Sequence, residues 1–371
     1  MRRIYADHNA TTPLAPDALA AMLPYFANHY GNASSVHLEG RDARAAVDSA
    51  RVRLAGLLGA QEGEIVFTGG GTESDNTAIF GVPPGHVITS STEHHAVLHA
   101  CQRRSDATFL PVGADGAVDP DELRRAIRPD TRLVSIMSAN NETGTVQPIR
   151  ELAAICRERG VLFHTDAVQS FGKVPVQVNQ WGVDLLSIAA HKFYGPKGVG
   201  ALYIRRGTRL QPLLYGGSHE NERRAGTENC PGIVGMVKAA EIAAAKMEAE
   251  GARLFQLTER LATGIEQTIP GSHRNGHPRL RVPNTVNFSF EGCTFEGLLL
   301  GLDLEGIAVS SGSACAVGSL EPSHVLIAMG VSRELARAAV RFSLGRANTD
   351  ADVEEILAAV TKVVKRLRTF S

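Results

Sequence analysis

The chain has 371 residues, of which 43% are hydrophobic and 21% are charged, and its formal net charge is -1. This composition is typical of a globular protein of about two domains, and it excludes a mainly disordered chain. The sequence has no basic excess for binding nucleic acid or an anionic membrane, so no direct partner of either kind is expected.

The apolar stretches, the N-terminal residues and the cysteines bear on where the protein is located. No uninterrupted apolar stretch approaches the roughly 18 residues of a membrane helix, and no apolar core follows the basic N-terminus, so we expect a cytoplasmic protein. The five cysteines are odd in number and form no CxxC pair, which disfavours a disulfide framework and a cysteine-rich zinc site. Most of them are expected to be small packing residues.

Short apolar runs alternate with amphipathic helical patterns through the first half of the chain. Continuous hydrophobicity suits strands that are covered on both faces, so this alternation predicts an α/β fold with a mostly parallel sheet. The predicted strands are Glu64–Thr68, His86–Thr89, Arg132–Met137, Val161–His164, Val183–Ile188 and Gly200–Ile204, and the helices between them include Arg41–Leu58, Asp119–Ile127 and Ile149–Arg159.

From about Pro231 the pattern changes to a second, smaller unit. Ile233–Thr268 is rich in helix-forming residues, and Asp350–Leu367 predicts a closing amphipathic helix. Between them, Asn284–Phe290 alternates like a strand with one solvated face. We expect the boundary between the two units near residue 250, within a helix and without a flexible linker.

Three polar motifs follow predicted strands, at the sheet edge where α/β proteins bind ligands. The first is the glycine run Gly69–Gly71 with Thr72, at the start of a predicted helix. It suits an anion such as phosphate, but a simple N-capped helix explains it equally well, and it has neither the dinucleotide nor the Walker spacing.

The other two motifs are His164–Gln169 and Ala190–Gly198. In isolation Asp166 is more typical of a helix N-cap, and Lys192 of a solvated surface charge, with Lys197 as the natural comparison. A phosphate cradle, a buried aspartate and a lysine at a strand end are together what pyridoxal phosphate (PLP) requires. The phosphate anchors the cofactor, the aspartate keeps the pyridine nitrogen protonated and the lysine forms the Schiff base.

The second unit contains two further candidates. Cys315 follows Ser310–Ala314, a run of small residues that could expose a thiol. Downstream, Arg341 and Arg346 offer guanidinium groups that suit a substrate carboxylate, although a surface ion pair explains them equally well.

Ordered motifs cover the chain nearly from end to end. They are Tyr5–Pro13, Tyr30–Ser35, Thr72–Asn76, Thr92–His94, Ala139–Gly144, His164–Gln169, His191–Lys192, Arg223–Asn229, Ser310–Cys315, Ser319–Ser323 and Arg341–Arg346. In these motifs the chain resembles the NifS/IscS-type cysteine desulfurases of the class V aminotransferase group. The resemblance implies an aspartate-aminotransferase-like fold of type I. Its large cofactor domain would span residues 13–250, and residues 1–12 plus 251–371 would form a smaller α+β domain carrying the cysteine loop.

The resemblance also implies a role for each matching residue. Lys192 would bind PLP, Asp166 would pair with its pyridine nitrogen, Gln169 would bond its phenolic oxygen and His94 would stack on its ring. The phosphate would be held by Gly71, Thr72 and His191, with Thr227 from the second subunit of a homodimer. Asn141 and Arg341 would bind the substrate carboxylate. Ala189 stands where some members carry a serine, so its side chain cannot supply that hydrogen bond to the phosphate.

The implied reaction converts L-cysteine to L-alanine and leaves the sulfur as a persulfide on Cys315. Lys192 would act as a base at Cα, and His94 would assist in protonation. A free thiol is only a few per cent ionised at neutral pH, so a base, either His94 or the substrate amine, should activate Cys315. No resident metal is expected, only transient contact of Cys315 with an iron–sulfur cluster.

Several questions about function stay open at this point. The alternatives are a selenocysteine lyase, another enzyme of the class V fold group, or a non-catalytic sulfur-relay subunit, which the intact Lys192, Asp166 and His94 disfavour. The persulfide would pass to a sulfur-acceptor or scaffold protein. The sequence does not tell whether that protein serves iron–sulfur cluster assembly, tRNA thiolation or DNA phosphorothioation.

Overall fold

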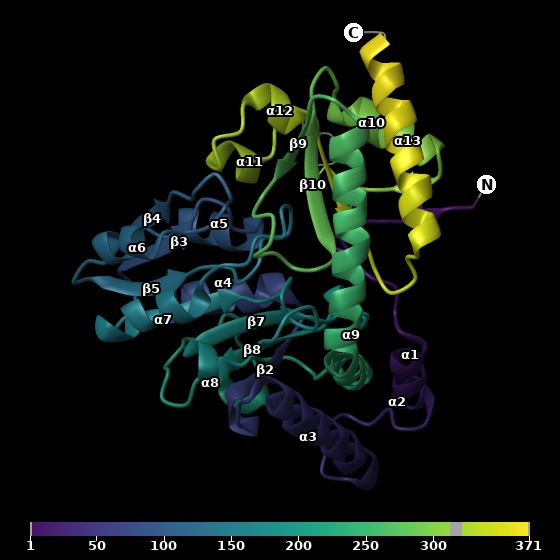
Figure 1. Ribbon diagram of the computed structural model, residues 1–371. Coiled ribbons are helices and arrows are strands. Elements are labelled where there is room, and N and C mark those ends of the chain that lie inside the picture. The colour runs from purple at the N-terminus through teal and green to yellow at the C-terminus, as the bar shows by residue number, and fades with distance from the viewer. Residues whose placement is uncertain (1, 312–320, 370–371) are drawn as a thin grey trace.

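The computed structural model describes residues 2–311 and 321–369. Within them, seven strands form a central sheet in the order β2-β8-β7-β6-β5-β3-β4 (Figure 1). Neighbours from β7 to β4 are parallel, whereas β8 is antiparallel to both β2 and β7. The predicted α/β fold with a mostly parallel sheet is confirmed. The strands are β2 (Ile65–Thr68), β3 (His86–Ser90), β4 (Ala107–Leu110), β5 (Thr131–Ser135), β6 (Leu162–Asp166), β7 (Leu185–Ala189) and β8 (Gly200–Ile204).

Both faces of this sheet are covered by helices, which explains why its strands are continuously apolar. In β2, Ile65 and Phe67 belong to one hydrophobic cluster and Val66 to another, because successive side chains point to opposite faces. Helices α3, α7 and α9 contribute to the first cluster, and α4 and α5 to the second. The helices of this part are α1 (Pro16–Met22), α2 (Pro24–Ala27), α3 (Leu38–Leu58), α4 (Gly71–Gly81), α5 (His95–Gln102), α6 (Pro120–Ala126), α7 (Ile149–Glu158), α8 (Val178–Trp181) and α9 (Cys230–Thr268).

The C-terminal part builds a second core around an antiparallel sheet in the order β12-β10-β9. A parallel pair, β1 with β11, joins the N-terminal segment to this part. Its elements are β1 (Ile4–Tyr5), β9 (Ser272–Asn275), β10 (Thr285–Phe290), α10 (Phe295–Leu304), β11 (Ile307–Ala308), α11 (His324–Ala328), α12 (Arg333–Arg337), β12 (Ala339–Ser343) and α13 (Asp350–Thr369).

The long helix α9 connects the two cores (Figure 1). Its N-terminal part, from Cys230 to Ala243, is buried in the first core, and Leu254 to Ile265 are buried in the second. The expected boundary near residue 250 therefore falls inside a continuous helix. The division into domains of residues 13–250 and of residues 1–12 plus 251–371 stays a prediction.

The expectation that Asn284–Phe290 has a solvated face is wrong, because every residue of β10 is buried. Its apolar side chains, such as Phe288, lie in the second core. Its polar side chains are buried through hydrogen bonds: Asn275 Nδ2 donates to Asn287 Oδ1 at 2.8 Å and to Ser289 Oγ at 2.9 Å. The alternation in sequence therefore separates an apolar interior face from a hydrogen-bonded interior face.

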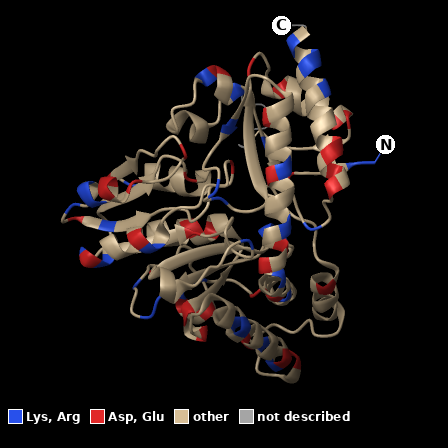
Figure 2. Ribbon diagram, in the orientation of Figure 1, with Lys and Arg blue, Asp and Glu red and all other residues tan. Residues whose placement is uncertain are grey.

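The distribution of surface charge and the burial of the cysteines are consistent with the near-zero net charge and with packing roles for the cysteines. Figure 2 shows Lys and Arg interspersed with Asp and Glu along the outer helices α3, α9 and α13. Among the described helices, none is long and apolar enough to cross a membrane. Cys101, Cys156 and Cys230 are buried free thiols, as expected of packing residues, and Cys293 is half-buried. Cys315 lies outside the described residues.

Candidate active site

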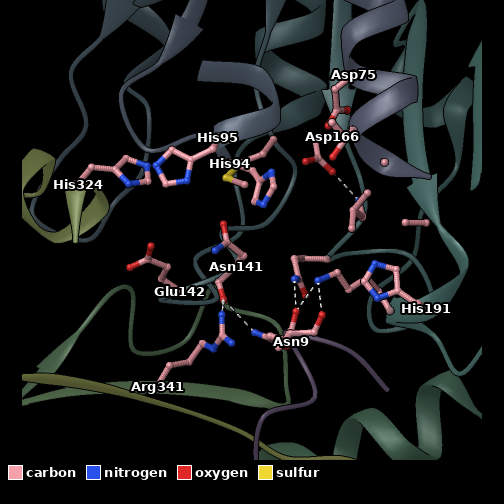
Figure 3. Close-up of a pocket in the computed structure, with 18 residues that line it drawn as sticks. Asn9, Asp75, His94, His95, Asn141, Glu142, Asp166, His191, His324 and Arg341 are labelled. Carbon is pink, nitrogen blue, oxygen red and sulfur yellow. Dashed lines mark hydrogen bonds between the residues drawn. The ribbon is translucent and has the colours of Figure 1, made fainter. Parts of the chain in front are cut away.

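A cavity of about 280 Å³ lies at the edge of the sheet where β2, β3, β5, β6 and β7 end. In Figure 3, Asp75 and Asp166 lie together at one end of the cavity, and Asn9, Asn141 and Arg341 lie along its lower side. Thr227 does not line it, and Cys315 belongs to the segment that the structure does not describe. The predicted site residues that the fold brings together here are Gly71, Thr72, His94, Asn141, Asp166, Gln169, His191, Lys192 and Arg341.

One end of the cavity is formed by the N-terminus of α4. Its N-cap Gly70 has φ 149°, a backbone conformation that favours glycine. At Gly71 an added Cβ would lie only 2.9 Å from Val168 Cγ2, so a residue with a side chain would crowd Val168. The first N–H groups of a helix have no partner within it, and together with the helix dipole they favour an anion. His191 lies beside them, and burial lowers its pKa to about 4. This end can therefore hold a phosphate.

Lys192 reaches the cavity from the 3₁₀ turn Ala190–Lys192 that follows β7. Its Nζ donates to the carbonyl oxygens of Asn9 at 2.7 Å and Ala10 at 2.8 Å. Lys197, five residues further on, is exposed in a turn. The interpretation of Lys192 as a solvated surface charge is therefore wrong, since its amine is held by main-chain carbonyls.

Asp166 is the last residue of β6 and is only 5% exposed. Its Oδ1 accepts the Val168 N–H at 2.8 Å, so the carboxylate does cap a turn, but it also lines the cavity. Burial raises the pKa of Asp166 to about 6, while the Val168 N–H and the charge of Lys192 act to lower it. Asp75 on α4 is buried nearby, and desolvation with the charge of Asp166 raises the pKa of Asp75 well above its usual range. A cationic ring nitrogen would offset this burial cost of the Asp166 charge.

His94 is the N-cap of α5, and its Nδ1 accepts the Ala96 N–H at 3.1 Å. Desolvation, aided by the charge of Lys192, lowers the pKa of His94 to about 4. The imidazole is therefore neutral at pH 7, with Nδ1 engaged as an acceptor and the proton on Nε2. In this state His94 can donate a hydrogen bond into the cavity.

Arg341 on β12 brings a guanidinium to the opposite side of the cavity. Its side chain is only 1% exposed, so the surface ion-pair interpretation is wrong. Nη2 donates to Asp7 Oδ1 at 2.6 Å, and Nη1 donates to the carbonyl oxygen of Asn141 at 2.9 Å. The Asn141 side-chain Oδ1 is buried without a hydrogen-bond partner among the described residues. The guanidinium fits a ligand carboxylate, and the unsatisfied Asn141 Oδ1, which is an acceptor, fits a ligand donor such as an ammonium group.

Sequence reasoning assigned no role to Asn9, although it lies in the quoted motif Tyr5–Pro13. Asn9 Nδ2 donates to the Asn141 carbonyl at 3.2 Å and to Thr285 Oγ1 at 2.8 Å. Asn9 Oδ1 accepts from Asn284 Nδ2 at 3.0 Å and from Lys173 Nζ at 2.9 Å. The residue thus ties β10 and its preceding loop to the floor of the cavity.

Glu142 and His324 also line the cavity without having been predicted. Glu142 Oε2 accepts the Ser323 hydroxyl at 2.5 Å, and a ring nitrogen of His324 lies 2.9 Å from the Glu93 carbonyl. His324 stacks near His95, with ring centroids 4.7 Å apart. No group of three or more His, Cys, Asp or Glu among the described residues is arranged to hold a metal ion.

Comparisons with known proteins agree with this geometry. Residues 4–356 match the model of the family described as aminotransferase class-V. The chain is 50% identical to the cysteine desulfurase IscS of Dictyoglomus turgidum over all of this chain and 96% of that protein. Among solved structures, a NifS-like protein superposes with a TM-score of 0.92 at 36% identity, over 98% of this chain and all of the other. The structure of SspA in complex with cysteine superposes with a TM-score of 0.82 at 38% identity, over 92% of this chain and 98% of the other.

Proposed function

The chain belongs to the class V aminotransferase family, and from this premise we propose that it is a PLP-dependent cysteine desulfurase. It converts L-cysteine to L-alanine and carries the released sulfur as a persulfide on Cys315. The observation that carries the proposal is one cavity that joins an anion-binding helix end, an amine, a buried carboxylate and a carboxylate-binding arginine. The near-full-length identity to cysteine desulfurases supports the choice of reaction within the family.

The residues present fit PLP. Gly71, Thr72 and His191 would hold the phosphate, and Asp166 would face the pyridine nitrogen, where a cation offsets the cost of its burial. Gln169 would contact the phenolic oxygen, His94 the ring, and Lys192 would bind the cofactor covalently. When bound, PLP supplies a sink for the electron pair that stays at Cα when a proton leaves.

The substrate is oriented by groups on the other side of the cavity. Arg341 binds the carboxylate of L-cysteine through its guanidinium, which Asp7 holds in place. Asn141 binds the same carboxylate through its Nδ2 donors, because its Oδ1 can only accept. Lys192 then moves the proton at Cα, and neutral His94 donates a hydrogen bond from its Nε2–H. The thiolate of Cys315 attacks the substrate sulfur and forms the S–S bond of the persulfide. The C–S bond breaks, and its electron pair stays on Cβ, which takes up a proton to give L-alanine.

The described chain on either side of residues 312–320 is fixed at the cavity. The Arg341 N–H donates to the Ser310 carbonyl at 2.7 Å, and the Ser323 hydroxyl donates to Glu142. Arg341 and Glu142 both line the cavity, so the described residues on each side of the segment that contains Cys315 contact the site.

We also propose that the enzyme is a cytoplasmic homodimer that delivers sulfur to an acceptor protein. A reducing compartment suits a catalytic thiol that must cycle through a persulfide. Between residues 19 and 38 the chain exposes a series of apolar side chains. Large exposed apolar patches are unusual on monomeric proteins and often mark an interface with another protein. They are Leu19, Leu23, Phe26, Tyr30, Val36 and Leu38. Across such an interface, Thr227 of the partner subunit would complete the phosphate site.

The decisive experiment replaces Cys315 by alanine. The variant should keep the visible absorption of bound PLP and lose sulfide release from L-cysteine in the presence of a reductant. The matched control is Cys293→Ala, which removes a half-buried free thiol that does not line the cavity and should keep full activity. Full activity of Cys315→Ala would overturn the assignment of the nucleophile, and a colourless wild-type protein would overturn the cofactor.

A further inference from the structure

A second lysine reaches the same site from the turn that follows β6. Lys173 Nζ donates to Gln169 Oε1 at 2.7 Å and to Asn9 Oδ1 at 2.9 Å. Lys173 is partly exposed as a residue, but both of its partners are buried, at 4% and 1% exposure. The inner end of this side chain therefore contacts two residues that line the cavity, although the proposed mechanism gives it no role.

The contacts of Lys173 determine which way the Gln169 amide points. Because Oε1 is held by the lysine, the amide nitrogen turns to the other side, where Nε2 donates to the Asn9 carbonyl at 3.0 Å. An amide nitrogen carries two N–H groups, so a second one remains for the cavity that Gln169 lines. A reversed amide would lose the bond from Lys173 and would place Oε1 against the Asn9 carbonyl oxygen, so Lys173 and Asn9 hold the amide in the same orientation.

The charges around Lys173 are mostly of its own sign. No carboxylate among the described residues forms an ion pair with it, and desolvation with the charges of Lys192 and Arg341 lowers the pKa of Lys173 well below the usual lysine range. Lys173 also lines a second, small cavity, which shares Lys192 with the first. The charged or titratable residues lining that cavity are His8, Lys192, Tyr194, Lys246, Glu250 and Arg346.

We infer that Lys173 is a positioning residue that holds the Gln169 amide by its oxygen and so directs an N–H toward the phenolic oxygen of the bound cofactor. The inference rests on the proposed function, because it concerns the same site. Hydrogen bonding to an anionic oxygen stabilises its charge, and an amide oxygen in the same place would destabilise it. The consequence is a change in the protonation of the bound cofactor, which is visible in its absorption spectrum.

The test titrates the absorption spectrum of the PLP-loaded protein with pH, without substrate. Lys173→Met keeps the length of the side chain and removes the donor. We expect the midpoint pH of the visible band to rise by on the order of one unit, since an anion that loses a donor binds its proton more tightly. Lys246→Met is the matched control: Lys246 is an exposed lysine of α9 that lines the same small cavity, and its loss should leave the midpoint in place.

A double-mutant cycle separates orientation of Gln169 from a general effect of charge. If Lys173 acts through Gln169, most of the rise caused by Lys173→Met should vanish when Gln169 is already leucine. An unchanged midpoint in Lys173→Met, or an equal rise in the Gln169→Leu background, overturns the inference. If Lys173→Met does not fold, Lys173→Gln, which keeps only a neutral donor, should raise the midpoint by less than about one unit, and Lys173→Arg, which keeps a charged donor, should leave it at the wild-type value. Equal midpoints in these two variants overturn the inference. A wild-type protein without a visible band refutes the proposed function instead.

Discussion

Replacing Asp166 by asparagine should stabilise the cofactor-free protein and at the same time weaken PLP binding. The two side chains have the same shape, and an asparagine oxygen can still accept the Val168 N–H that Asp166 Oδ1 accepts at 2.8 Å. The substitution therefore removes the buried charge and little else. Without the cofactor, that charge costs stability, because it is only partly offset by its neighbours.

The magnitude follows from the pKa of Asp166, which burial raises from 3.8 to about 6. Each pH unit of difference corresponds to about 1.4 kcal/mol, so the charge costs at most on the order of 3 kcal/mol above pH 6. Between about pH 4 and 6 the folded state binds more protons than the unfolded state, and the free energy of unfolding falls as pH rises. The side chain of the Asp166→Asn variant cannot titrate, so the advantage of this variant should be near zero at pH 4 and largest above pH 6.

The assay is denaturant unfolding of the cofactor-free protein at several pH values, with and without added PLP. Asp184→Asn is the control, because Asp184 also accepts a main-chain N–H, from Phe163, but is partly exposed and lies 3.2 Å from an Arg205 nitrogen. This control should not become more stable. With PLP present the order should reverse for Asp166→Asn, since ligand binding then favours the wild type. A cofactor-free Asp166→Asn protein that is less stable than wild type at pH 8, or whose gain does not shrink toward pH 4, would refute the reasoning.

Three further substitutions address the rest of the site. His94→Asn keeps an N-cap residue for α5, so circular dichroism should be unchanged while alanine formation slows by about 100-fold or more; near-normal turnover would contradict a role for His94 in the reaction. Gly71→Ala places a Cβ 2.9 Å from Val168 Cγ2 and should weaken PLP binding by about tenfold in a fluorescence titration, and unchanged affinity would show that the cradle can relax. Arg341→Lys should raise KM for L-cysteine by about tenfold or more, because a lysine cannot keep both the Asp7 and the carboxylate contacts; a pure loss of kcat would argue against carboxylate binding.

The sheet could be predicted from sequence because burial on both faces leaves a local signal. The edge strand β4, in which Phe109 is 37% exposed, has no such continuous run and was not predicted. The polar residues of β10 were expected to meet water, since a sequence does not show that distant segments satisfy them. In both cases the sequence of the strand does not show which distant segments cover its side chains.

The candidate site divides in the same way. Asp166 and Lys192 were found because they follow buried strands, and the ends of parallel strands meet at one edge. Their individual roles came from resemblance to a family. Asn9 had no such signal, because its contacts with Asn141, Gln169 and Lys173 join segments 132, 160 and 164 residues apart. Lys173 contacts Gln169 four residues away, but only the distant contact with Asn9 ties it to the N-terminal segment.

The contacts of Asn9 limit how the two ends of the site can move. Its carbonyl accepts from Lys192 Nζ and Gln169 Nε2, while its side chain bonds Asn284 and Thr285 at the start of β10. Two side-chain bonds to β10 and its preceding loop, at about 0.5–1.5 kcal/mol each, would have to break if β10 moved away from the cofactor end. Arg341 is carried on β12, which pairs with β10, so the carboxylate site is held in register with the amine of Lys192. The substrate's Cα is therefore positioned by a preformed frame, and the motion that sulfur transfer requires must come from segments that Asn9 does not tie.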